Sequence, residues 1–121
     1  MKEIRISGRA GQGAITTARI LAMALFAEGR YALAFPHFGA ERMGAPMNAF
    51  VRLSDQKIRL RSRVLQPHYL LVIDASLAKA KEFDVFGGLR PDGIAIVNAP
   101  NGQFWQSAGQ AQVITVPASQ I

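Results

Sequence analysis

Apolar and polar residues alternate along several short stretches of the chain, and one helical pattern separates the first two. The alternating run from Ile4 to Ser7 predicts a strand, and Thr16 to Glu28 predicts a helix. Apolar residues surround most of the circumference of this helix, so we expect it to be deeply buried. Gly29 is a plausible helix end, and Tyr31 to Phe35 predicts another short strand.

Two further alternating stretches lie in the middle of the chain. Met47 to Leu53 and Ile58 to Val64 predict two strands, and Ser54 to Lys57 between them contains turn-forming residues. Strands joined by so short a turn pair antiparallel, so these two are expected to form a hairpin. A plain parallel sheet has no such hairpin, and the sheet is therefore predicted to be mixed.

The rest of the chain predicts a βαβ unit. Tyr69 to Ile73 is a continuous apolar run typical of a buried central strand, and Ser76 can cap a helix that runs to about Phe83. Ile94 to Val97 predicts the next strand, and Gln112 to Val116 predicts the last.

Together these elements indicate an α/β fold. We predict three layers, α/β/α, around a mixed, mostly parallel sheet that includes one antiparallel hairpin. Residues 1–121 are expected to form a single domain that is incomplete at its C-terminal end, because Pro117 to Ser119 has the pattern of a helix start with no helix after it.

Composition narrows the possible functions. Half of the residues are hydrophobic and none is cysteine, which excludes disulfides, thiolate zinc sites and iron–sulfur clusters held by these residues. The longest apolar run, Ile20 to Ala27, is too short to cross a bilayer, and no signal segment precedes the first strand. A cytoplasmic location is therefore expected.

Basic residues give the chain a formal net charge of +6. Four of them occupy alternate positions that a strand would place on one face, forming a predicted basic stripe of Lys57, Arg59, Arg61 and Arg63. Few aromatic residues lie between them, so a solvated face or a subunit interface is favoured over a nucleic-acid surface. We predict no nucleic-acid partner and no membrane partner.

The candidate chemistry lies in a glycine-rich turn between the first strand and the helix. Gly8, Gly11 and Gly13 have neither the spacing of the dinucleotide fingerprint nor the Lys and Ser or Thr of a P-loop, where Ala14 and Ile15 stand instead. The amides at a helix N-terminus can nevertheless hold a phosphate. A tight structural turn and an anion site are equally compatible with this stretch.

Other polar residues give weaker indications. Asp74 follows a predicted central strand, where it could face a ligand crevice or only cap the following turn. His37 and His68 are the two histidines, and neither lies in a nucleophile motif, so structural or surface roles are favoured. No histidine or carboxylate spacing indicates a metal site.

Several segments, taken in order, resemble the gamma subunit of pyruvate:ferredoxin and related 2-oxoacid:ferredoxin oxidoreductases. They are Gly8–Gly13, the F-P-H-F-G-A-E-R-M-G-A-P run of Phe35–Pro46, Phe50–Arg52, Ile58–Ser62 and Pro67. The resemblance extends from Ile4 to Asn98 and slightly favours the pyruvate branch. Ala10, where the family often has another glycine, and Met43, where it often has a second arginine, depart from the pattern.

The resemblance implies a multi-chain enzyme that decarboxylates a 2-oxo acid on thiamine diphosphate. Electrons then pass through iron–sulfur clusters to ferredoxin, and an acyl-CoA is released. These residues contain neither cysteine nor the G-D-G motif for thiamine diphosphate and Mg²⁺. The resemblance therefore places those cofactors in alpha, beta and delta-type partner subunits, and this chain is not expected to be active alone.

The resemblance also implies that the gamma domain helps to receive coenzyme A. The residues matched to this role are Gly8, Arg9, Ala10, Gly11, Gln12, Gly13 and Arg42. The alternative is a non-catalytic scaffold domain, in which the glycine turn is purely structural and the basic hairpin docks a partner.

Overall fold

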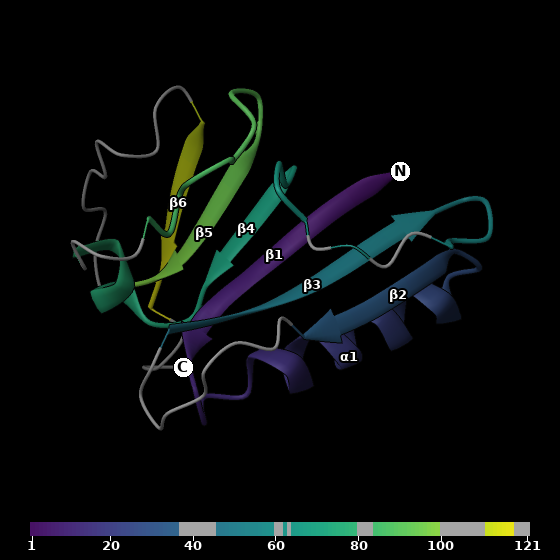
Figure 1. Cartoon of the computed structure of the whole chain (residues 1–121), viewed down its shortest axis with the longest axis horizontal. Helices are drawn as coiled ribbons and strands as arrows, with labels where there is room; N and C mark the ends of the chain where they lie inside the picture. Colours follow the sequence, from purple (N-terminus) through teal and green to yellow (C-terminus); the bar gives the residue numbers. More distant parts are fainter. Residues whose placement is uncertain (37–45, 60–61, 63, 80–83, 100–110, 118–121) are drawn as a thin grey trace.

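The protein is described by a computed structural model that covers residues 1–36, 46–59, 62, 64–79, 84–99 and 111–117. Six strands form one sheet in the order β2-β3-β1-β4-β5-β6 (Figure 1). The strands are β1 (Lys2–Arg9), β2 (Tyr31–Pro36), β3 (Pro46–Ser54), β4 (Tyr69–Val72), β5 (Ile94–Asn98) and β6 (Gln112–Val116). The helices are α1 (Ala14–Ala27) and the 3-10 helix η1 (Ala75–Lys79).

The sheet is mixed, as the sequence predicts. β1, β4, β5 and β6 pair in parallel, whereas β3 is antiparallel to both β1 and β2. The predicted α/β class and the mostly parallel sheet are therefore confirmed. The strands predicted at the start of the chain, after α1 and in the last third all form, each within a few residues of its expected bounds.

The predicted partner of β3 is wrong. Ile58, Arg59, Ser62 and Val64 are not in a strand, and β3 instead pairs with β2 in an antiparallel hairpin. The physical reason is that β1 and β2 occupy both hydrogen-bonding edges of β3, leaving no edge for a strand that follows it. Lys57 and Arg59 of the predicted basic stripe are likewise not in a strand, and its other two members, Arg61 and Arg63, lie outside the described residues.

Helix α1 packs on one face of the sheet over β2, β3 and β1 (Figure 1). Ala14 and Ala18 lie one turn apart and are buried against Ile6, Ala49 and Val51. Their small side chains let the helix backbone approach the strands closely. This packing fixes the direction in which the chain leaves β1.

The prediction that this helix is deeply buried is wrong. Ile20, Met23 and Phe26 are 62%, 70% and 69% exposed, respectively. Only one side of α1 contacts the sheet, and no described residue covers the other side. An apolar circumference in the sequence therefore does not correspond here to burial all around.

The opposite face of the sheet has its own apolar cluster. Leu70 and Val72 of β4 point to this face, because neighbouring Leu71 and Ile73 pack with α1. They pack with η1, with the segment after it and with β5, in a cluster of Leu70, Val72, Leu77, Val85, Phe86, Ala95, Val97 and Ala99. The helix expected from Ser76 to Phe83 is a 3-10 helix as far as Lys79, and residues 80–83 are not described.

Polar side chains line this second face along β1. Arg52, only 1% exposed, forms an ion pair with Glu3 at 2.8 Å and lies over the Phe35 ring, 5.2 Å from its centroid. Arg5 donates a hydrogen bond to the Val85 carbonyl at 2.8 Å, and Ser7 donates one to Asn48 at 2.7 Å. The second face of β1 is therefore polar yet largely buried.

Candidate functional site

The glycine-rich turn lies where β1 ends and α1 begins. Gly11 and Gly13 have φ angles of 92° and 82°, in the left-handed region that favours glycine. Gly13 is the N-cap of α1, and no side-chain hydrogen bond to the cap is found among the described residues. Amide groups of the first helical turn thus remain available for another acceptor. The predicted order of strand, glycine-rich turn and helix is confirmed.

Chain direction predicts a crevice beside this turn. From β1 the chain passes to α1 on one face of the sheet, whereas from β4 it passes to η1, which packs on the opposite face. The connections that follow these two adjacent parallel strands therefore leave the sheet on opposite faces. This is the position at which open α/β sheets bind ligands. The glycine-rich turn and Asp74 lie there together.

Gln12 closes the turn onto the neighbouring strand end. Its Oε1 accepts a hydrogen bond from the Arg9 N–H at 2.7 Å, and its Nε2 donates to Asp74 Oδ2 at 2.9 Å. A Cβ added to Gly8 would lie 3.3 Å from the same Oε1. Glycine at this position therefore leaves room for the glutamine amide to reach both partners.

Arg9 and Asp74 form the charged part of the site. Arg9 Nε lies 3.4 Å from Asp74 Oδ2, and Arg9 Nη2 donates to Ser76 Oγ at 2.9 Å. Ser76 in turn donates to Asp74 Oδ1 through its hydroxyl at 2.7 Å and its N–H at 2.9 Å. The Ser76 hydroxyl, with Gln12 and Arg9, holds the pKa of Asp74 below its ordinary value against a smaller desolvation effect, so this carboxyl is ionised at neutral pH.

The structure brings most of the sequence-predicted site residues together. Gly8 and Arg9 end β1, and Ala10, Gly11, Gln12 and Gly13 form the turn that follows. Asp74 both caps the start of η1 and faces that turn. Arg42 and His37 lie outside the described residues. The sequence did not predict the hydrogen bonds from Arg9 to Ser76 and from Gln12 to Asp74. The Asp-x-Ser spacing could have predicted the Asp74–Ser76 bond, but the bond to Arg9 joins residues 67 positions apart.

His68 has a structural contact away from this crevice. Its Nδ1 accepts a hydrogen bond from the Glu3 N–H at 3.1 Å, which requires that nitrogen to be unprotonated. Partial burial, together with the charges of Arg90 and Lys2, lowers the pKa of His68. Within the described part of the chain, no group of three or more metal-ligating side chains occurs, and no helix is long and apolar enough to cross a membrane.

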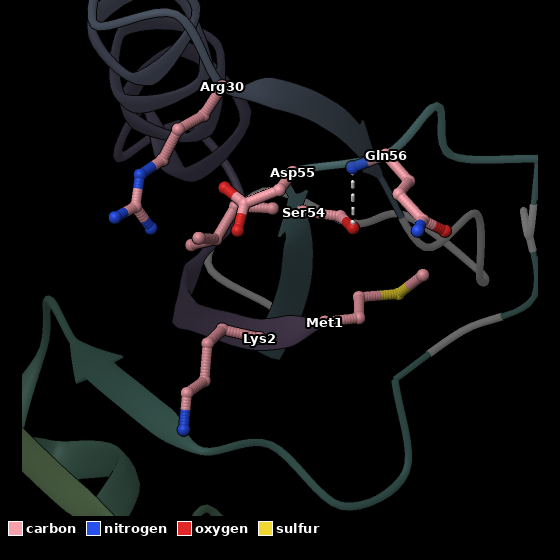
Figure 2. A pocket seen from close by; sticks show the side chains of 7 residues that line it. Met1, Lys2, Arg30, Ser54, Asp55 and Gln56 are labelled. Carbon is pink, nitrogen blue, oxygen red and sulfur yellow. Dashed lines mark hydrogen bonds between the residues drawn. The ribbon is translucent and has the colours of Figure 1, made fainter.

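A hollow of about 480 Å³ lies at the other end of β1, far along the strand from the glycine-rich turn. It is lined by Met1, Lys2, Arg30, Leu53, Ser54, Asp55 and Gln56. Figure 2 shows the charged ends of Lys2 and Arg30 well apart in this view and not turned toward each other. The hollow therefore offers no converging cations for an anion, and the crevice remains the better candidate site.

Comparison with known proteins identifies the family. The profile described as "Pyruvate ferredoxin/flavodoxin oxidoreductase" matches residues 3–121. The chain belongs to this family. Pyruvate synthase subunit PorC of Methanosarcina barkeri is 47% identical over 122 aligned residues, which cover 100% of this chain and 66% of that protein. The pyruvate/ketoisovalerate oxidoreductases common subunit gamma of Pyrococcus abyssi is 51% identical over 98 residues, covering 81% of this chain and 52% of that one.

Solved structures of related fold agree. Pyruvate oxidoreductase subunit PORC of Thermotoga maritima superposes with a TM-score of 0.79 at 36% identity, covering 98% of this chain and 63% of that one. A 2-oxoglutarate:ferredoxin oxidoreductase of Magnetococcus marinus, solved with 2-oxoglutarate, coenzyme A and succinyl-CoA bound, gives 0.72 at 21% identity over 98% of this chain and 20% of that one. The latter likeness concerns the fold alone. This member of the oxidoreductase family thus spans just under two thirds of the length of the PorC relatives.

Proposed function

We propose that this chain is the gamma component of a 2-oxoacid:ferredoxin oxidoreductase whose substrate is pyruvate, and that it contributes to coenzyme A binding. The names of the PorC relatives support the reaction class and the choice of pyruvate. The observation that carries the role of this chain is the glycine-rich turn, which opens α1 where the connections from β1 and β4 leave the sheet on opposite faces. Alpha, beta and delta-type subunits would complete the complex, with ferredoxin as electron acceptor.

The turn has the chemistry to hold a phosphate of coenzyme A. Beyond the neighbouring residues of the chain itself, no described atom lies within 4 Å of a Cβ built on Gly11 or Gly13, so an anion could approach the backbone there. The N-terminus of α1 supplies amide donors and a partial positive charge, and Arg9 supplies a guanidinium group. Asp74 already engages Arg9, so a bound phosphate would share this cation rather than take a free one.

The redox steps belong to other chains in this proposal. Thiamine diphosphate, when bound, supplies the group on which the 2-oxo acid loses CO₂, and iron–sulfur clusters carry the two electrons to ferredoxin. Residues 1–121 contain no cysteine to hold a cluster. The part that we assign to this chain is to position coenzyme A as the acceptor of the acyl group.

A pair of variants at Gly11 tests the proposal. Asn and Asp have nearly the same shape and both tolerate positive φ better than other side chains, so Gly11→Asn and Gly11→Asp differ mainly in charge. In the assembled enzyme we expect the Asp variant to raise the KM for coenzyme A about tenfold more than the Asn variant, since a carboxylate would face the phosphate. The KM for pyruvate should remain unchanged in both.

A truncated acceptor provides the matching control. Pantetheine carries the reactive thiol of coenzyme A but lacks its phosphates, so its KM should be equal in the two Gly11 variants. If the Asn and Asp variants show the same KM for coenzyme A, the turn does not bind phosphate.

The alternative is a non-catalytic scaffold domain with a purely structural turn. The observation that favours it is the hydrogen bonding already present within the site. Gln12 accepts from the Arg9 N–H and donates to Asp74, and the Arg9 guanidinium donates to Ser76. The scaffold function predicts that charge reversal at exposed Arg59 disrupts assembly while the affinity of any remaining complex for coenzyme A is unaltered. Normal assembly of Arg59→Glu would argue against this basic segment as the docking site.

A further inference from the structure

The outward side of α1 carries large apolar residues in a continuous row. Ile20, Met23 and Phe26 follow one another at intervals of three residues, which places them on adjacent turns of one helix face. All three are more than three-fifths exposed, whereas the inward face carries the buried Ala14 and Ala18. Isolated exposed apolar residues are ordinary, but a row of three on one helix is typical of an interaction surface.

A hollow extends this row past the end of the helix. It has a volume of about 220 Å³ and is lined by Phe26, Gly29, Arg30 and Tyr31. Tyr31 is itself 46% exposed. A hollow of this size at the edge of an apolar row can receive one large side chain from a partner, in the way that interface hot spots fill pockets.

Cations bracket the row at both ends. Arg19 lies one turn before Met23 on the same helix face, and Arg30 lies four residues after Phe26 and lines the hollow; both are exposed. Glu28, the acidic residue in this segment, lies on a different side of the helical wheel from Met23. The charge pattern therefore favours a partner with apolar residues flanked by carboxylates.

We propose that the outward face of α1 is a docking surface for another subunit of the same enzyme complex. Its centre is Ile20, Met23 and Phe26, and its rim is Arg19 and Arg30. The partner presents an apolar segment with flanking Asp or Glu side chains, and one of its large apolar residues fills the hollow beside Phe26. A helix of this length, about 21 Å, matches the centre of an interface of standard size. The inference rests on the proposed membership of a complex, and it is independent of coenzyme A binding.

A single cysteine at Met23 tests the surface. Because residues 1–121 contain no native cysteine, the thiol in Met23→Cys is a unique reporter within them. Labelling by a maleimide, quantified on the peptide by mass spectrometry, is compared between the separately purified full-length chain and the assembled complex. We expect rapid labelling in the chain alone and at least tenfold slower labelling in the complex. The same samples, unfolded in denaturant, give the full-labelling reference.

The other labelling outcomes overturn the proposal. Slow labelling in both samples would mean that another part of the same chain covers the face. Rapid labelling in both would mean that no subunit docks there. If Met23→Cys prevents folding of the chain, Thr16→Cys, at an exposed position on the same helix face, replaces it.

Charge reversal tests the chemistry of the partner. The double variant Arg19→Glu/Arg30→Glu should weaken assembly at least tenfold, and its neutral match Arg19→Gln/Arg30→Gln should weaken it less, with an effect that diminishes as salt increases. Lys2→Glu, at an exposed cation on β1, changes the charge as much as Arg19→Glu alone, so it is the control for that single variant and should assemble normally. If the Glu and Gln double variants assemble equally well, the partner does not present carboxylates to Arg19 and Arg30. Any complex that still assembles with these variants should have an unchanged KM for coenzyme A. An assembly defect of this kind is thereby distinguished from the coenzyme A defect expected for Gly11→Asp.

Discussion

The two faces of β1 are both covered, but by opposite chemistry. On one face Ile4 and Ile6 pack against α1 in a cluster without charged groups. On the other face Glu3, Arg5 and Ser7 each reach a partner distant in the sequence: Arg52, the Val85 carbonyl and Asn48. The apolar face depends on close packing, whereas the polar face depends on the exact pairing of donors and acceptors. The alternation of apolar and polar residues along β1 therefore gives two buried faces, one apolar and one polar.

The difference has an energetic meaning. An apolar side chain removed from a packed layer loses transfer energy and leaves a cavity. A buried ionic partner removed from its pair leaves the other charge desolvated and unpaired, which costs more than the pair itself contributes. We therefore expect the polar face to be the more sensitive of the two to truncation, and the more tolerant of paired replacement.

The largest effect is expected for Arg52→Ala on the polar face. The change removes the ion pair with Glu3 and the contact with the Phe35 ring, and should lower the free energy of unfolding by about 4 kcal/mol. Chemical denaturation measures it, with Lys57→Ala, an exposed cation, as the control. The double variant Glu3→Gln/Arg52→Met should recover most of the loss, and failure to do so would contradict the unpaired-charge explanation.

A smaller effect is expected for Ile6→Ala on the apolar face. Ile6 is fully buried under α1, so the variant should lose about 3 kcal/mol through lost transfer energy and the resulting cavity. Ile6→Val, which removes one methylene group, should lose about 1 kcal/mol. A loss for Ile6→Ala as large as that for Arg52→Ala would remove the distinction between the faces.

The smallest effect is expected from pH, and only on the polar side. The lowered pKa of His68 means that the unfolded chain binds its proton first, so stability is complete above the unfolded value of about 6.5 and decreases as pH falls through the lower folded value. His68→Asn should reduce this slope, because an amide oxygen can accept from the Glu3 N–H without titrating. Thermal unfolding between pH 7 and 5 checks it, and an unchanged slope would exclude His68 as the source.

The sequence predicts local features of this fold better than distant pairings. The strand, glycine-rich turn and helix at the start of the chain, and the strands at Tyr69 and Ile94, all follow from periodicity and glycine conformation. The strand expected at Ile58 does not form, because its edge on β3 is taken by β2 and β1. Periodicity also cannot tell whether a neighbour exists, so the apolar circumference of α1 does not predict the exposure of Met23.

The candidate site divides in the same way. Gly11 and Gly13 are readable from sequence because their conformation is local. The bonds that join Gln12 to Asp74 and Arg9 to Ser76 span 62 and 67 positions, respectively, and depend on β1 and β4 lying side by side. Arg42 remains a sequence prediction for the site.

The buried guanidinium of Arg52 also selects one strand alignment during folding. Val51 and Arg52 alternate across β3, so a slip of one residue against β1 would turn Arg52 toward the alanines of α1. A misaligned sheet would then hold an unpaired cation in an apolar layer. That penalty raises the free energy of the misaligned sheet and favours the native alignment of β1, β2 and β3.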